Sequence, residues 1–240
     1  MNYEYSKNIL GQSESERNAN KESLSLALSK TLKSESVDCI SELAEVGLDS
    51  ILEEGLFKEL PIISTAVAIY KIGGSIKDRH NLKKLMVFLN EINNGIVDEQ
   101  KRQEYQQKFI SNDKFRNQEI EYLLVLIDRY ISYDKPQMLA KLYLAYLDGV
   151  LTWEEVTMYS EIIDRFIYRD LEMLKEGNQY SVSVDYIPDA LLRLISLGLM
   201  VELEKPINTP TTLGSITIPV ATQKDYVLTN FGAKLIDILN

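Results

Sequence analysis

The chain has only one cysteine and one histidine among its 240 residues, and this scarcity excludes several classes of site. A single cysteine cannot form an internal disulfide, which is typical of a protein in a reducing compartment. Cys39 and His80 together cannot complete the four-ligand shell of a zinc ion. A nucleophilic Ser or Cys normally needs a histidine base, and His80 lies in no nucleophile motif. We therefore expect no catalytic residue, no metal and no cofactor, and we expect the protein not to be an enzyme.

Positive charge and phosphate-binding loops are also scarce. The sequence has 26 Lys and Arg against 36 Asp and Glu, which gives a formal net charge of −10. Such a chain has no broad attraction for nucleic acid, because binding relies on many cations near phosphates. Neither glycine-rich phosphate loop, G-x-x-x-x-G-K-[ST] or G-x-G-x-x-G, is present. The polar first 23 residues lack the apolar core of a signal peptide. No apolar run reaches the roughly 18 residues of a conventional transmembrane helix.

The apolar residues that are present recur at helical spacing and predict a mainly α fold. Short connections between the helical stretches favour an antiparallel bundle. The predicted helices cover residues 23–33, 37–60, 75–92, 117–132, 135–151 and 152–176. The last of these begins at a capping box formed by Thr152 and Glu155 and ends at Gly177. The predicted organisation is a flexible arm over 1–22, N-terminal helices over 23–95, a helical bundle over 96–177 and a winged-helix-like domain over 178–240.

The C-terminal segment changes character and predicts a small winged-helix-like α+β element. A helix over 187–197 is followed by an alternating strand over 199–204, a Pro/Thr/Gly-rich hairpin over 206–218 and a second strand over 225–229. A final helix is predicted to be capped near Thr229 or Asn230. The helix that would read DNA offers one basic side chain, Arg193, which argues against duplex DNA as a partner.

Residues 60–89 combine features that are unusual in a soluble bundle. Residues 61–70 carry no charge, residues 71–84 carry five cations, and residues 35–59 carry eight acids against one lysine. A helix over 60–76 would be about 25 Å long, which nearly crosses a thinned bilayer. Its small side chains permit close helix approach in lipid. The alternative is a buried helix whose small residues allow tight packing in a soluble core.

A membrane function assigns two sets of residues in this stretch. The apolar helix would supply the lining and contacts of a pore, with candidate residues Pro61, Ser64, Thr65, Ala68, Lys71, Ile72, Gly73 and Gly74. The basic helix over 77–92 would bind an anionic ligand or lipid headgroup through Lys77, Arg79, Lys83 and Lys84. Since one short helix cannot form a conduit, a pore would require several copies of the chain.

Three segments carry a resemblance to a known group of proteins. ELPIISTAVAIYKIGGSIKDRHNLKKLMVFL, NQEIEYLLVLIDRYISYDKPQMLAKLYLAYLDG and the YVLTNFGAKL ending resemble bacterial abortive-infection-type proteins found near phage-defence genes. They are also similar to channel effectors that are paired with a nucleotidyltransferase, as in Hailong-type systems. The resemblance covers roughly residues 37–170 and the tail. It implies a homo-oligomeric channel in the bacterial inner membrane, controlled by a nucleotide or oligonucleotide ligand that the partner nucleotidyltransferase makes.

Two functions of different class follow from these observations. The first is a non-enzymatic antiphage effector that oligomerises into a membrane pore or ion channel. It would lie in the bacterial inner membrane, or in the cytoplasm with membrane association. The second is a soluble regulatory protein whose winged element binds a protein partner or DNA.

Overall fold

A computed structural model gives the fold, and it divides the chain into two compact units between Thr152 and Trp153. The structure describes residues 26–28, 30–31, 65, 76–95, 100, 103–104, 107, 113–176, 179–182, 187–205, 212–213, 216–217 and 223–240. The division comes earlier in the chain than the predicted boundary between residues 177 and 178. Within the described residues the fold is mainly helical, so the predicted fold class is confirmed at this level.

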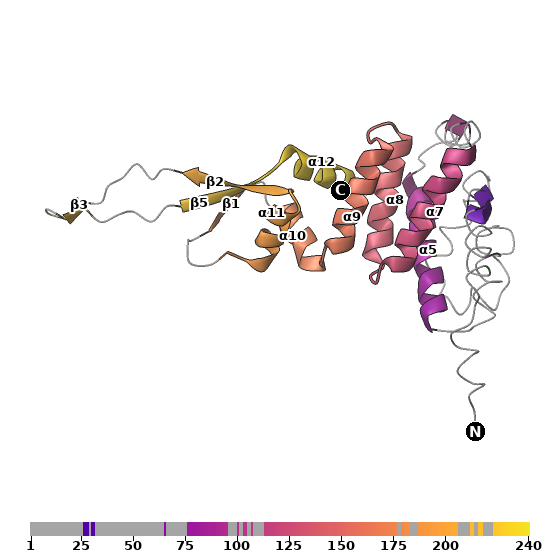
Figure 1. The fold of residues 1–240 in the computed structure, drawn as a ribbon, viewed down its shortest axis with the longest axis horizontal. Helices are drawn as coiled ribbons and strands as arrows, with labels where there is room; N and C mark the ends of the chain where they lie inside the picture. The colour runs from indigo at the N-terminus through magenta and orange to yellow at the C-terminus, as the bar shows by residue number, and fades with distance from the viewer. Residues whose placement is uncertain are drawn as a thin grey trace, which may run out of the picture. The chain divides into compact units, whose positions relative to one another are not determined.

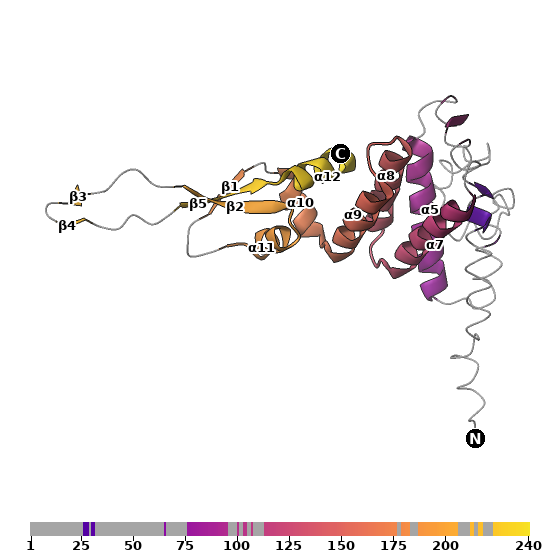
Figure 2. The same cartoon turned by 45° about the horizontal axis from the view of Figure 1, so that its top comes forward.

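Unit 1 is built on three helices that pack side by side (Figures 1 and 2). They are α5 (Ile76–Gly95), α7 (Asp113–Arg129) and α8 (Asp134–Leu147). His80, early in α5, bonds Tyr133 just before α8, and Glu91, late in α5, bonds Gln137 further along α8. The helices α5 and α8 are therefore parallel, and α7 is antiparallel to both.

Helical periodicity explains how these three helices bury their apolar residues. On α5, side chains spaced by three or four residues are at most 3% exposed, and they are Leu82, Leu85, Leu89 and Ile92. The same spacing buries Leu123 and Ile127 on α7, and Leu139 and Tyr143 on α8. The predicted helices over 75–92, 117–132 and 135–151 correspond to α5, α7 and α8, because the apolar spacing that predicted them is the spacing of the buried side chains.

The described residues of unit 2 form four helices, and two of these replace a single predicted helix. They are α9 (Trp153–Arg165), α10 (Tyr168–Glu176), α11 (Asp189–Ser196) and α12 (Asn230–Leu239). The prediction of one helix over 152–176 is wrong, because the helix breaks at Phe166 and Ile167. The carboxylate of Asp170 accepts a hydrogen bond from the Ile167 amide at 3.1 Å, which caps the first turn of α10.

Strands of unit 2 form a three-stranded antiparallel sheet in the order β1-β5-β2. They are β1 (Gln179–Val182), β2 (Met200–Lys205) and β5 (Gln223–Leu228), and a separate two-stranded pair joins β3 (Thr212–Leu213) to β4 (Ile216–Thr217). Helices α10, α11 and α12 gather at the end of the sheet where β2 begins (Figure 2). β2 and β5 occupy the predicted strand positions, whereas β1 was not predicted.

The sheet is joined to the final helix through Thr229, which is one of the two predicted caps. Its hydroxyl accepts a bond from the Gly232 amide at 3.0 Å and donates to the Gly198 carbonyl at 2.8 Å. Gly198 adopts a φ of 73°, a left-handed conformation that ends α11 and favours glycine. The segment 198–199 therefore lies against the first turn of α12.

Candidate functional site

The first half of α5 forms hydrogen bonds to the turn that connects α7 to α8. The Asn81 side chain donates to the Asp128 carboxylate, the Lys84 ammonium bonds the end of α7, and the His80 ring bonds the turn itself. All three groups lie on consecutive turns of α5, so they reach the same stretch of chain. These hydrogen bonds hold residues 128–133 against α5.

Lys84 is buried, which separates it from the surface cations with which it was predicted to act. Lys84 is only 1% exposed. Its Nζ donates to the carbonyl oxygens of Asp128 at 2.9 Å and Tyr130 at 2.6 Å. Carbonyls at a helix C-terminus lack intrahelical partners and carry partial negative charge, so a cation there is favourable. We therefore remove Lys84 from the proposed anion-binding set and assign it to closing the end of α7.

Replacing Lys84 with methionine should destabilise unit 1 by about 2 kcal/mol at neutral pH, because the buried Tyr130 carbonyl and the partly buried Asp128 carbonyl lose their donor. Burial lowers the pKa of Lys84 below its ordinary 10.5, and the nearby Asp128 only partly opposes this. Between the lowered pKa and 10.5 the unfolded chain binds more protons, so the stability of unit 1 should rise with pH in that window. Amide hydrogen exchange of α5 and α7 measures both effects. A slope that persists in Lys84→Met would assign it to another group.

His80 bonds the turn through both ring nitrogens. Its Nε2 lies 2.8 Å from the Ile131 carbonyl oxygen, and its Nδ1 lies 2.8 Å from the Tyr133 hydroxyl. A carbonyl can only accept, so Nε2 carries the hydrogen and, in the neutral ring, Nδ1 accepts from Tyr133. The imidazole and phenol rings are 4.8 Å apart between centroids. His80 therefore supports the turn by bonding a backbone carbonyl and a phenol hydroxyl.

The three remaining predicted anion-binding residues lie on the exposed side of α5. Lys77, Arg79 and Lys83 are all exposed. The Lys77 ammonium is 3.8 Å from the Asp128 carboxylate, and both side chains are more than half exposed, so this pair contributes little to stability. The Lys83 ammonium lies over the Tyr133 ring, 4.7 Å from its centroid. The structure therefore brings Lys77 and Lys83 to the same turn that His80 and Lys84 hold, and Arg79 is exposed next to His80 in the sequence.

Sequence reasoning missed the apolar residue at the centre of this region. Ile131 is 85% exposed, the most exposed large apolar side chain among the described residues. Arg129 is exposed two positions before it, and Lys135 follows with its ammonium 5.9 Å from the Tyr130 ring centroid. We name the basic turn surface as the set Lys77, Arg79, Lys83, Arg129, Ile131 and Lys135.

The predicted pore residues are not brought together by the part of the chain that the structure describes. Pro61, Ser64, Ala68, Lys71, Ile72, Gly73 and Gly74 lie outside it, as does the predicted arm over 1–22. Thr65 is helical and half-buried, and Ile76 begins α5. Among the described helices, none is both long and apolar enough to cross a bilayer. The pore assignment therefore stays a prediction.

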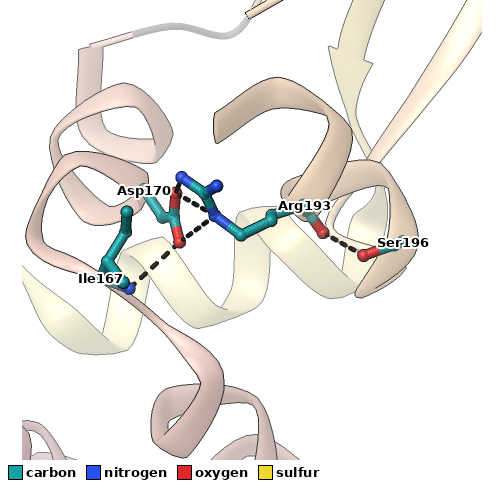
Figure 3. Close-up of polar contacts among 4 residues, drawn as sticks. All are labelled: Ile167, Asp170, Arg193 and Ser196. Carbon is teal, nitrogen blue, oxygen red and sulfur yellow. Dashed lines mark hydrogen bonds and ion pairs between the residues drawn. The ribbon is translucent and has the colours of Figure 1, made fainter. Parts of the chain in front are cut away.

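In unit 2, Arg193 is held by a buried carboxylate rather than presented to a groove of DNA (Figure 3). Its guanidinium donates to Asp170 through Nε at 2.9 and 3.0 Å and through a terminal nitrogen at 2.6 Å. Asp170 is fully buried, and these hydrogen bonds raise the pKa of Arg193. The pair connects α10 to α11. The residue that was predicted to be the basic reader of the winged element is thus occupied within the fold.

No known protein family, curated protein or solved structure gives a significant match to this chain. In the described ranges, no group of three or more His, Cys, Asp and Glu side chains is placed to hold a metal ion. The basic turn surface is accordingly the candidate site, on its geometry and charge alone.

Proposed function

We propose that this protein is a non-enzymatic, membrane-acting effector of bacterial antiphage defence, which oligomerises to form a pore or ion channel. The observation that carries the proposal is the basic turn surface. It gathers five exposed or half-buried cations around one protruding isoleucine in a chain of formal net charge −10. The uncharged residues 61–70 lie just before α5 in the sequence, so the same helix that bears the cations follows the candidate membrane segment.

Membrane electrostatics supports this reading. An anionic leaflet attracts Lys and Arg held near its surface, and each contributes about 1 kcal/mol. An acidic protein gains from this attraction only if its cations are gathered on one side, as they are at this turn. Oligomerisation is part of the proposal, because a single short apolar helix per chain cannot enclose a water-filled path. The resemblance to channel effectors supports the further proposal of control by a nucleotide-derived ligand.

Replacing Ala68 with aspartate should abolish ion conductance, because a charge in the apolar segment opposes its entry into lipid by about 3 kcal/mol per subunit. The measurement is single-channel recording in planar bilayers, together with growth arrest in bacteria. Ala68→Ser is the control, since it keeps a small side chain and should conduct. If purified wild-type protein carries no current and stays monomeric with lipid, the pore proposal is wrong.

A second function is favoured by the topology of unit 2. A central β5 between β1 and β2, with α11 connecting those two edge strands, matches the strand order of a winged-helix element. We propose that such an element here binds a protein partner, because Arg193 is paired with Asp170 and the exposed positions of α11 include Asp189 and Leu192. Titration of the wild-type chain with random duplex DNA tests the DNA alternative. Binding that falls steeply with salt would favour it.

A further inference from the structure

We infer that the α7–α8 turn is a membrane-docking element, in which Ile131 inserts into an anionic leaflet while the surrounding cations contact lipid phosphates. This inference rests on the proposed membrane function and names a contact separate from residues 61–76. The turn was not assigned any role by the sequence pattern. Its case depends on three properties: a fixed backbone, a single outward apolar side chain and a local excess of positive charge.

The outward position of Ile131 is imposed by the structure on both sides of the residue. The Tyr130 carbonyl accepts from Lys84, and the Ile131 carbonyl accepts from His80 Nε2. Tyr130 is 2% exposed, so its ring is buried beside an isoleucine that is 85% exposed. A side chain presented by a fixed backbone loses little conformational entropy on binding. The turn therefore holds Ile131 in a conformation suited to insertion.

Charge identifies the occupant of this surface. Residues 76–84 and 128–135 contain six Lys and Arg against three Asp, and without the buried Lys84 the excess of positive charge is two, whereas the whole chain has an excess of ten acids. One of the six, Lys84, is buried and bonded to carbonyls. The remaining five are placed on both sides of the turn. This local excess of positive charge favours an anionic partner.

The apolar tip distinguishes a membrane from the other anionic partners. A soluble nucleotide would use the cations and leave Ile131 in water. A protein partner would need an apolar patch of several residues to bury a substantial interface, but at this turn the neighbouring described side chains are mainly charged or polar. An apolar side chain with Lys and Arg on the neighbouring segments suits an interfacial membrane contact, because the apolar group can enter the acyl boundary while the cations meet anionic headgroups. We therefore assign the surface to anionic phospholipid.

Vesicle flotation of the full chain tests the insertion of Ile131. Vesicles of phosphatidylcholine with one quarter phosphatidylglycerol should bind the wild type, and Ile131→Glu should lower the partition coefficient at least about tenfold. Val150→Glu is the matched control, because Val150 is 57% exposed in the turn beyond the opposite end of α8. Equal binding by the two variants and the wild type would overturn the inference. Far-ultraviolet circular dichroism checks that each variant is folded.

A second pair of variants tests the cations. Removing two charges in Lys77→Gln/Lys83→Gln should weaken binding roughly 25-fold at low salt, since each cation contributes about fivefold. Arg165→Gln/Lys175→Gln removes the same charge from exposed positions of unit 2 and should bind as the wild type does. Binding should also disappear on pure phosphatidylcholine and decline as salt rises. Equal losses in the two double variants would show a net-charge effect and overturn the assignment.

Flotation and conductance separate the docking inference from the pore proposal. Ala68→Asp should still float on anionic vesicles while carrying no current, because the turn is intact. A wild type that floats through Ile131 but never conducts would leave docking standing and refute the pore. If the wild type and Ile131→Glu conduct equally well and also float equally well, the docking inference is refuted and the pore proposal is not.

Discussion

Gly232→Ala should reduce the stability of unit 2 by about 3 kcal/mol, although the same change in an open helix usually stabilises by about 1 kcal/mol. A Cβ at this position would collide with the Leu199 carbonyl oxygen and lie 3.0 Å from its carbonyl carbon. Backbone atoms cannot move aside as a side chain can. Thr229 also holds residues 198 and 199 against this turn, because its hydroxyl donates to the Gly198 carbonyl and its backbone amide donates to the Leu199 carbonyl.

Denaturant unfolding followed by Trp153 fluorescence measures this loss, because the only tryptophan of the chain lies in unit 2. Gly95→Ala is an informative comparison. There the added Cβ would meet side-chain atoms of Leu144, which can rotate away. We expect Gly95→Ala, followed by amide hydrogen exchange of unit 1 in which Gly95 lies, to cost clearly less than Gly232→Ala. Equal effects would mean that the approach of α12 to Leu199 is looser than the structure indicates.

Asp170→Ala should lower the unfolding free energy of unit 2 by about 2 to 3 kcal/mol. The change removes a fully buried carboxylate that accepts from the Arg193 fork and from the Ile167 amide. Arg193 is partly exposed and can recover some hydration, which limits the loss. Trp153 fluorescence is again the probe.

Arg193→Lys tests the geometry of the same pair. Lysine keeps the charge but not the planar fork, so this variant should be less stable than the wild type. It should be more stable than Arg193→Ala, which leaves the Asp170 carboxylate buried without its counter-ion. A fully stable Arg193→Ala would contradict the pairing. It would also return Arg193 to consideration as the basic side chain that reads DNA.

The helices could be predicted because their apolar spacing is regular, but the turn surface could not. Continuing the predicted helix to residue 132 would put Ile131 four positions after the buried Ile127, on the core face. The helix instead ends at Arg129, so Tyr130 turns inward and Ile131 turns outward. An end three residues earlier than predicted reverses the burial of both side chains. Sequence spacing alone does not fix helix ends to that accuracy.

The burial of Lys84 did leave a signal in the sequence that was not used. Positions 81, 84, 88 and 92 follow helical spacing, and all four are buried. Reading Lys83 and Lys84 as one basic pair overlooked that adjacent helix residues point about 100° apart. The Asp170–Arg193 pair is a different case. Its partners are 23 positions apart on two helices, and nothing in the local pattern connects them.

The parallel course of α5 and α8 gives unit 1 a polarity. The N-terminus of α5 and the Ile131 turn lie at one end, where the chain arrives from residues 61–75, while Leu147 lies at the other end, where the chain departs toward residue 153. The first residue of α5 and the last residue of α8 therefore lie at opposite ends of this helix pair. If unit 1 binds lipid through Ile131, the first residue of α5 lies at the membrane-facing end of this helix pair, and Leu147 at the end of α8 lies at the far end.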